Sequence, residues 1–273
     1  MKLIDTHSHL YDEAFDPDRE EALARAAAEG VETLLLPAID SESHGRLFEL
    51  CRRHPERCVP MMGLHPTSVN DNPRWREELA SVERYLQTPP EGIPAFCAVG
   101  EIGLDFYWSH DFREEQTEAF RRQIELALQY GLPIAVHTRD AWPETVALVR
   151  EFRGRGLRGV FHAYSDGIET CRELRELGDF VFGIGGVVTF KKSRLAEVVR
   201  DMELREIVLE TDCPYLTPAP HRGERNESAY VRLVCDKIAE LKGLAAETVA
   251  AATTANAEAL FGIRYTEKNT ERR

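Results

Sequence analysis

Two kinds of segment alternate along this 273-residue chain. One is a short run of mostly apolar residues, such as residues 31–38; the other is longer and places apolar residues at helical spacing, such as residues 113–130. A nearly unbroken apolar run predicts a strand buried on both faces, as in a parallel sheet covered by helices. We therefore predict eight strands: the first opens at residue 3, and the others cover residues 31–38, 58–63, 95–101, 133–137, 159–162, 180–184 and 206–210.

Capping signals separate the helices from these strands. Asp16 and Pro17 offer an N-cap and a proline at the first helical position, and Gly30 ends the same segment. The remaining helices are expected at residues 43–54, 75–86, 113–130, 142–152, 168–177, 194–202, 230–241 and 247–261.

Eight strand–helix units predict an α/β fold, a (β/α)₈ TIM barrel with extra C-terminal helices. A doubly wound sheet is the alternative, but its glycine fingerprint is missing after the first strand. We expect a single barrel domain over residues 1–263 and a polar tail over residues 264–273.

Composition indicates where the protein works and which kinds of partner it lacks. No segment approaches the ~20 apolar residues of a membrane span, and the first strand follows Met1 at once, so we expect a cytoplasmic protein that does not contact membranes. The net charge of -13 disfavours a broad nucleic-acid-binding surface, and no stable protein partner is evident. The six cysteines form no C-x-x-C pair and are expected to be buried free thiols.

Chemistry-bearing residues gather where the predicted strands end. His7 and His9 follow the first strand at i and i+2, a spacing that points both imidazoles to one side. In a barrel, functional groups collect at the carboxyl ends of the strands, and this chain places there His7, His9, His65, Glu101, Asp105, His137, Arg139, His162, Glu210 and Asp212. Three further histidines, at positions 44, 54 and 110, lie on or near helices and are expected at the surface.

Six of these groups are expected to be metal ligands: His7, His9, Glu101, His137, His162 and Asp212. Four imidazoles and two carboxylates exceed what one tetrahedral catalytic site uses, but they suit two divalent ions ~3.5–4 Å apart. Glu101 is the candidate bridge, because a carboxylate can give one oxygen to each ion. The mixed nitrogen and oxygen set does not choose among zinc, manganese and magnesium.

Seven ordered motifs carry a family resemblance: DTHSHL, GLHP, GEIGLDFYW, PIAVHTRDA, VFHAYS, LETDCPYL and RGERN. In order and spacing they resemble the TatD-type metal-dependent deoxyribonucleases, within the wider amidohydrolase-like barrels. The resemblance runs from about residue 3 to residue 261. It implies a (β/α)₈ fold, the same six metal ligands and phosphodiester hydrolysis, with 3′-5′ exonuclease action on single-stranded DNA and possible action on RNA. It also implies that His65 and Asp105 are active-site residues, and we assign Asp105 to substrate binding.

The expected mechanism follows from the metals. A water molecule bridging two divalent ions loses a proton near neutral pH and attacks phosphorus, with Asp212 orienting it or accepting that proton. Glu101 joins the two ions, and His65 steadies a phosphate oxygen or protonates the leaving oxygen. Arg139 and Arg222 offer forked donors to phosphate, unless they form salt bridges with the abundant carboxylates.

The sequence alone leaves several alternative functions open. An ester hydrolase acting on aminoacyl-tRNA would share every ligand, and a small-molecule amidohydrolase or lactonase would share the barrel, although its two-metal members often use a modified lysine where this chain has Glu101. A non-enzymatic scaffold would have lost ligands, and none is lost. The glycines of residues 183–186 either expose N–H groups to phosphate or serve a turn, and the aromatic residues 106–108 either stack on an unpaired base or pack a long loop.

The chain departs from the family pattern at two places. Ala163 and Tyr164 stand where the family usually has Cys-Phe, which can alter the pocket floor. Ser228 stands where a proline is usual, which can loosen the loop that carries Arg222.

Overall fold

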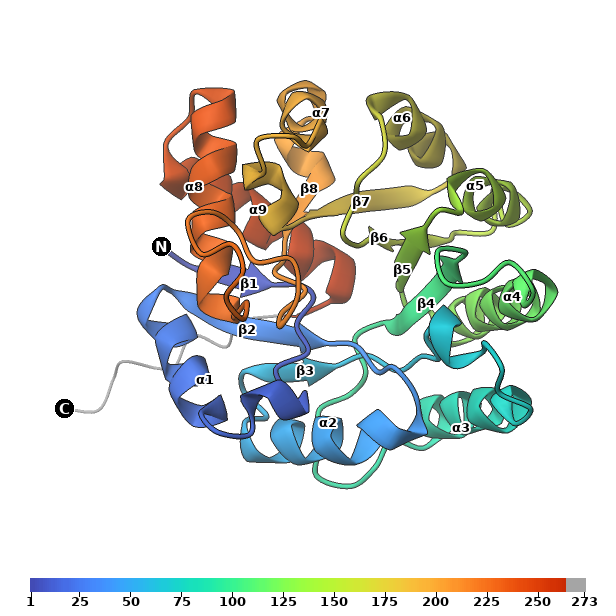
Figure 1. Cartoon of the computed structure of the whole chain (residues 1–273). Helices are drawn as coiled ribbons and strands as arrows, with labels where there is room; N and C mark the ends of the chain where they lie inside the picture. Colours follow the sequence, from blue (N-terminus) through green and yellow to red (C-terminus); the bar gives the residue numbers. More distant parts are fainter. Residues whose placement is uncertain (264–273) are drawn as a thin grey trace.

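The computed structural model describes residues 1–263, and the predicted tail over 264–273 lies outside the described residues. Parallel strands form a ring with helices around the outside, as the (β/α)₈ prediction requires (Figure 1). The strands are β1 Leu3–Asp5, β2 Val31–Leu36, β3 Cys58–Pro60, β4 Val99–Asp105, β5 Ile134–Arg139, β6 Arg158–Phe161, β7 Asp179–Ile184 and β8 Ile207–Leu209.

The barrel closes at two seams. Strands β1 to β3 form one hydrogen-bonded sheet and β4 to β8 another. One seam is a bridge between Met62 and Val99, and the other a bridge between Ser8 and Cys213. The second seam matters for function because it lays the segment after β1 beside the segment after β8, with the Asp212 amide donating to the carbonyl of His7 at 2.9 Å.

The helices follow the predicted order, and two of them, α4 Arg113–Tyr130 and α6 Ile168–Leu177, have the predicted bounds. The others are α1 Arg19–Ala28, α2 Ser41–Arg53, α3 Trp75–Gln87, α5 Trp142–Arg150, α7 Leu195–Asp201, α8 Val231–Lys242 and α9 Ala246–Phe261, with short 3₁₀ turns η1 Glu13–Phe15, η2 Pro66–Ser68, η3 Gly186–Thr189, η4 Leu204–Glu206 and η5 Ser228–Tyr230. Helix α1 begins later than predicted, so Pro17 precedes it and Asp18 is the N-cap.

Alternate residues of each strand belong to two different cores, because neighbouring side chains leave a strand on opposite faces. Leu34 and Leu36 of β2 pack in the large core toward the helices, whereas Leu35 belongs to a second core inside the barrel. Residues in or directly beside most strands share this inner core, among them Ile4, Leu35, Met61, Ala98, Ala135, Val160 and Val208. Helix α9 adds Ala257, Leu260 and Phe261 to it, so α9 closes the end of the barrel where the strands begin.

Strand β4 differs from its prediction in a way that affects the site. The expected strand ended at Glu101, but β4 continues to Asp105, and its register with β5 shifts between Val99 and Ile102. An extra residue in one strand reverses which side chains face each way. Glu101 therefore points into the barrel from within β4, and Asp105 follows it on the same face.

The prediction of a surface position for His44 is wrong. Its side chain, on α2, is 5% exposed and stacks on Phe48, with the Tyr85 ring edge-on at 5.3 Å. Burial lowers the pKa of His44. The predicted burial of the cysteines is confirmed, since all six are free and buried. Among the described residues, no helix has the length and apolar character needed to cross a membrane.

We predict that Phe261→Ala destabilises the fold by about 3 kcal/mol, because the ring is 6% exposed inside the barrel and its loss leaves a cavity there. Urea denaturation followed by far-ultraviolet circular dichroism measures the change. Leu244→Ala is the control, because Leu244 is 41% exposed and its loss should change the free energy of unfolding by less than about 0.5 kcal/mol. Equal denaturation midpoints for the two variants would show that α9 does not close the barrel.

Candidate metal centre

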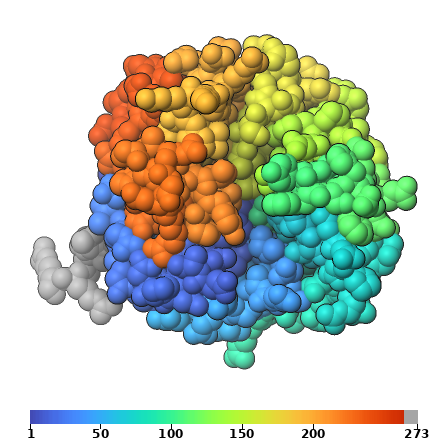
Figure 2. Space-filling view, in the orientation of Figure 1, coloured from blue at the N-terminus to red at the C-terminus, as the bar shows by residue number. Residues whose placement is uncertain are grey.

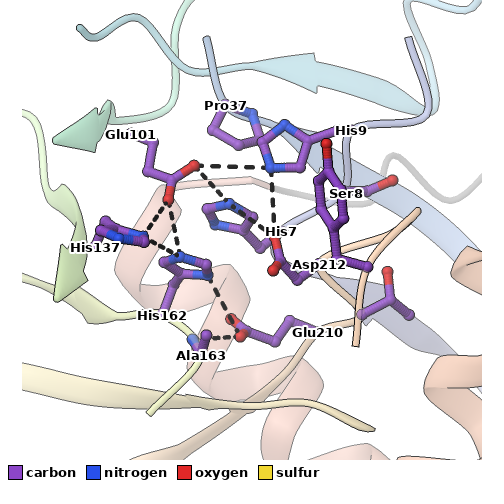
Figure 3. A network of polar contacts seen from close by, with 12 residues as sticks. His7, Ser8, His9, Pro37, Glu101, His137, His162, Ala163, Glu210 and Asp212 are labelled. Atoms are coloured by element: carbon purple, nitrogen blue, oxygen red, sulfur yellow. Dashed lines mark hydrogen bonds and ion pairs between the residues drawn. The ribbon is translucent and has the colours of Figure 1, made fainter. Parts of the chain in front are cut away.

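The side chain of Glu101 is the meeting point of imidazoles from several strands (Figure 3). Its Oε1 lies 2.9 Å from Nε2 of His162 and 3.0 Å from Nδ1 of His137. Its Oε2 lies 3.1 Å from Nε2 of His7 and 3.7 Å from Nε2 of His9. The two oxygens of one carboxylate thus face two separate pairs of histidines.

Asp212 completes the side occupied by His7 and His9. Its Oδ1 lies 3.4 Å from Nε2 of His9 and 3.8 Å from Nε2 of His7. The potential metal-binding atoms of His7, His9 and Asp212 all lie within 4.8 Å of one another. The same is true of His7, Glu101 and His162. Asp212 has a φ of +57°, a conformation that L-residues rarely adopt and that occurs often at functional sites.

The outer nitrogens of His9 and His137 are hydrogen-bonded to other groups, which is the arrangement that metal-ligating histidines need. Nδ1 of His9 lies 2.9 Å from the Tyr11 hydroxyl, which itself donates to the Pro37 carbonyl at 2.6 Å. The hydroxyl therefore accepts from His9, so that in the neutral ring Nε2 of His9 is the nitrogen available to bind a cation.

Carboxylates lie at the outer nitrogens of His137 and His162, as a hydrogen bond at His137 and as a longer contact at His162. Nε2 of His137 lies 3.0 Å from Asp105 Oδ2, so its Nδ1 is directed to Glu101. Nδ1 of His162 lies 3.6 Å from Glu210 Oε1, which also accepts from the Ala163 amide at 2.5 Å. The donor set and its outer contacts fit divalent metal ions held between Glu101 and the histidines.

His65 differs from His137 in which of its nitrogens faces Glu101. Its Nδ1 accepts from the Thr67 amide at 3.2 Å, so the proton of the neutral ring lies on Nε2. That Nε2 is 3.3 Å from Glu101 Oε1. Burial lowers the pKa of His65, which favours the neutral ring. His65 is therefore arranged as a hydrogen-bond donor at the edge of the cluster.

The charges of the cluster depend on one another. Burial would raise the pKa of Glu101, but His162, His65 and His7 hold it well below the usual range. Burial would lower the pKa of His162, but the Glu101 carboxylate raises it well above the usual value and Glu210 adds to this effect. Burial lowers the pKa of His7. The carboxylates thus need positive charge beside them, which a proton or a metal cation can supply.

The predicted substrate-binding residues are placed differently from one another. Asp105 is 1% exposed and directed at His137 from the end of β4. Arg139 ends β5 two residues after His137, with its guanidinium 3.6 Å from the centre of the Tyr107 ring. The guanidinium of Arg222 lies 3.6 Å from the Phe190 ring. Within the described part of the chain, neither arginine forms the salt bridge that was the alternative to phosphate binding.

Tyr164 and Ser228, two of the residues that depart from the family motifs, are buried. Ser228 lies 3.0 Å from the Ser8 hydroxyl, so it ties its loop to the segment that carries His7 and His9 instead of loosening it. Tyr164 is 1% exposed and its hydroxyl donates to the Gly167 carbonyl at 2.6 Å.

Glycines at the end of β7 leave room for the groups around them. A Cβ on Gly183 would lie 2.0 Å from Glu210 Oε2, and one on Gly186 would lie 2.1 Å from the Leu216 carbonyl oxygen. Close packing therefore explains why these two positions hold glycine.

Two supporting residues, Tyr11 and Glu210, have contacts that are not evident from the sequence. Tyr11 carries no predicted role, and Glu210 is predicted at a strand end without a function. The spacing of Glu210, two residues before Asp212 after a buried strand, was the available signal. The sequence gives no indication of the role of Tyr11, because its hydroxyl is oriented toward His9 by the Pro37 carbonyl, which is distant along the chain.

Comparison with known proteins gives the class of this molecule. The family model described as TatD related DNase matches residues 4–262. The barrel and its cluster of histidines and carboxylates define a metal-dependent hydrolase. The chain belongs to the TatD family.

Several relatives match over nearly their full length. The chain is 37% identical to the uncharacterized metal-dependent hydrolase YabD of Bacillus subtilis strain 168, covering 96% of this chain and 99% of the relative. It is 32% identical to a protein of Citrobacter rodentium named 3'-5' ssDNA/RNA exonuclease TatD, covering 96% and 98%. Among solved structures, YJJV, a TatD homolog from Escherichia coli K12, has a TM-score of 0.86 at 28% identity, covering 96% and 98%.

We predict that Gly183→Ala lowers metal content and reduces turnover by about 10- to 100-fold, because its methyl group displaces the Glu210 carboxylate that faces His162. Elemental analysis of purified protein measures the metal per chain, and a melting curve reports whether the fold is kept. Gly185→Ala is the matched control, since a Cβ there would meet Glu210 atoms only at 3.5 Å or more. Wild-type metal content and turnover in Gly183→Ala would show that Glu210 does not support the centre.

Proposed function

We propose that this protein is a 3′-5′ exonuclease that acts on single-stranded DNA, and also on RNA, with two divalent metal ions bound at Glu101. Residues 1–263 serve as one catalytic domain. The six free buried cysteines suit a reducing compartment, so we place the activity in the cytoplasm.

The observation that carries the proposal is the position of the Glu101 carboxylate between two sets of ligands. We assign one ion to His7, His9 and Asp212, and the other to His137 and His162, with one Glu101 oxygen toward each. Paired metal sites of this kind favour displacement at phosphorus, because they stabilise both the attacking and the leaving oxygen.

The residues around the ions have distinct roles in this proposal. Bound divalent ions would polarise the phosphate and lower the pKa of water at the site. Asp212 accepts the proton of the attacking water; burial would raise its pKa, but His9 and its neighbours hold that pKa below the usual value, so the carboxylate is ionised. His65 donates a hydrogen bond from Nε2 to a phosphate oxygen or to the leaving oxygen.

The residues beyond the cluster divide between positioning and binding. Asp105 is a positioning residue for His137, because its side chain is 1% exposed and its Oδ2 lies 3.0 Å from Nε2 of His137; the substrate contact expected of it stays a prediction. Arg139 and Arg222 are exposed and available for phosphate groups. The name of the Citrobacter rodentium relative supports the choice of single-stranded DNA and RNA as substrates.

A substrate panel tests the activity. We expect the protein, loaded with manganese or magnesium, to shorten 5′-labelled single-stranded DNA from its 3′ end, to leave a 3′-blocked strand intact, and to lose activity after chelation. Matched RNA and an aminoacyl-tRNA complete the panel. Cleavage that survives exhaustive chelation would contradict the metal mechanism, and release of the amino acid with intact DNA would favour the ester hydrolase instead.

Metal stoichiometry tests the assignment of ligands. We expect His162→Ala to lose one of two ions and more than about 100-fold in turnover, because it removes a ligand of one ion only. Glu101→Gln should weaken both ions and nearly abolish turnover, since the amide cannot bridge them. His54→Ala is the control, as His54 pairs with Glu20 outside the cluster. Two ions retained in His162→Ala, measured by elemental analysis, would refute the assignment.

A further inference from the structure

Two aromatic side chains beside the metal centre are unusually exposed. Tyr107 is 53% exposed and Trp108 is 70% exposed, directly after β4. Their rings meet edge-on with centres 4.9 Å apart. Phe106, the first aromatic residue of this loop, is 2% exposed and anchors it, so packing accounts for Phe106 and leaves the next two unexplained.

The backbone that carries these rings is hydrogen-bonded to residues beside the cluster. Asp105 accepts from the Tyr107 amide through Oδ1 at 3.0 Å, while its Oδ2 lies 3.0 Å from His137. The loop is also bonded to β5, where the Phe106 amide donates to the Arg139 carbonyl at 3.0 Å. The same carboxylate thus places a histidine of the cluster and the start of the exposed aromatic pair.

A cation accompanies the pair. Arg139 lies two residues after His137 on β5, so both side chains leave the strand on the same face. Its guanidinium is 3.6 Å from the centre of the Tyr107 ring and 5.7 Å from that of Trp108. Among the described residues, Arg139 has no carboxylate partner, although the chain carries 47 acidic residues.

The surroundings leave this surface open. In the space-filling view, the loop after β4 and the loop between β8 and η5 face each other across a hollow at the centre of the visible face (Figure 2). The second loop exposes Tyr215, which is 58% exposed and lies edge-on to His9 at 6.4 Å between ring centres. The hollow above the cluster therefore has exposed aromatic residues on both sides.

We infer that Tyr107, Trp108 and Arg139 form a stacking platform for an unpaired base of the substrate strand, next to the scissile phosphate. This inference rests on the proposed nuclease function and names how the strand is held. A net charge of -13 leaves few phosphate contacts outside the metal centre, so base stacking has to supply binding free energy. A stacked base needs free faces, which a single strand has and a duplex lacks. Arg139 then offers its N–H groups to the adjacent phosphate.

The test compares two single strands of one length: one complete, and one whose 3′-terminal nucleotides are abasic. The metal-loaded wild-type protein should prefer the complete strand by about 5- to 50-fold in kcat/KM, since stacking is sequence-tolerant but needs a base. In Trp108→Ala and Tyr107→Ala this preference should shrink, through a higher KM for the complete strand with kcat and metal content kept. Trp108→Phe should restore it, and the surface variant Leu244→Ala should match wild type.

Each outcome decides between the claims. Equal preference in wild type and Trp108→Ala, with DNA still cleaved, overturns the platform while the nuclease function stands. A fall in kcat and metal content with unchanged KM also overturns it, because the loop would then only support the cluster. Absence of cleavage of either strand by wild type overturns the nuclease function and the platform with it.

Discussion

A single buried carboxylate organises this molecule. Glu101 is 2% exposed and surrounded by imidazoles, so its charge has to be balanced at short range by protons or by cations. The barrel brings imidazoles from distant parts of the chain to it: His7 follows the first strand and His162 follows the sixth. The fold serves this site because strands that adjoin in space deliver their last residues to one place.

Residues outside the cluster orient its histidines. Tyr11, Asp105 and Glu210 each face the outer nitrogen of one histidine, and each is itself held in place, Tyr11 by the Pro37 carbonyl and Glu210 by the Ala163 amide. These contacts select which nitrogen of each ring faces the centre. His65 shows the opposite choice, because Thr67 occupies its Nδ1 and leaves a donor toward Glu101. The neutral rings of His65 and His137 thus differ in whether the nitrogen that faces Glu101 carries a proton.

Much of this architecture follows from sequence periodicity. The strand order, the bounds of α4 and α6, and the gathering of polar groups at strand ends were all predictable, because burial on both faces imposes unbroken apolar runs. The bulge in β4 was not predictable, since it depends on how β4 pairs with the neighbouring strand β5. Tyr11 and Asp105 gained their roles from contacts that cross between strands or pass through backbone carbonyls, and His44 is buried by neighbours from another helix. Such contacts cannot be predicted from the spacing of residues along the sequence.

The central claim is that Glu101 joins two metal ions, one on each side of its carboxylate. Anomalous scattering from crystals of the manganese-loaded protein tests it most directly. The account predicts two peaks, one among His7, His9, Asp212 and Glu101 Oε2, the other among His137, His162 and Glu101 Oε1. A single peak at full loading, or two peaks that do not share Glu101, would contradict it.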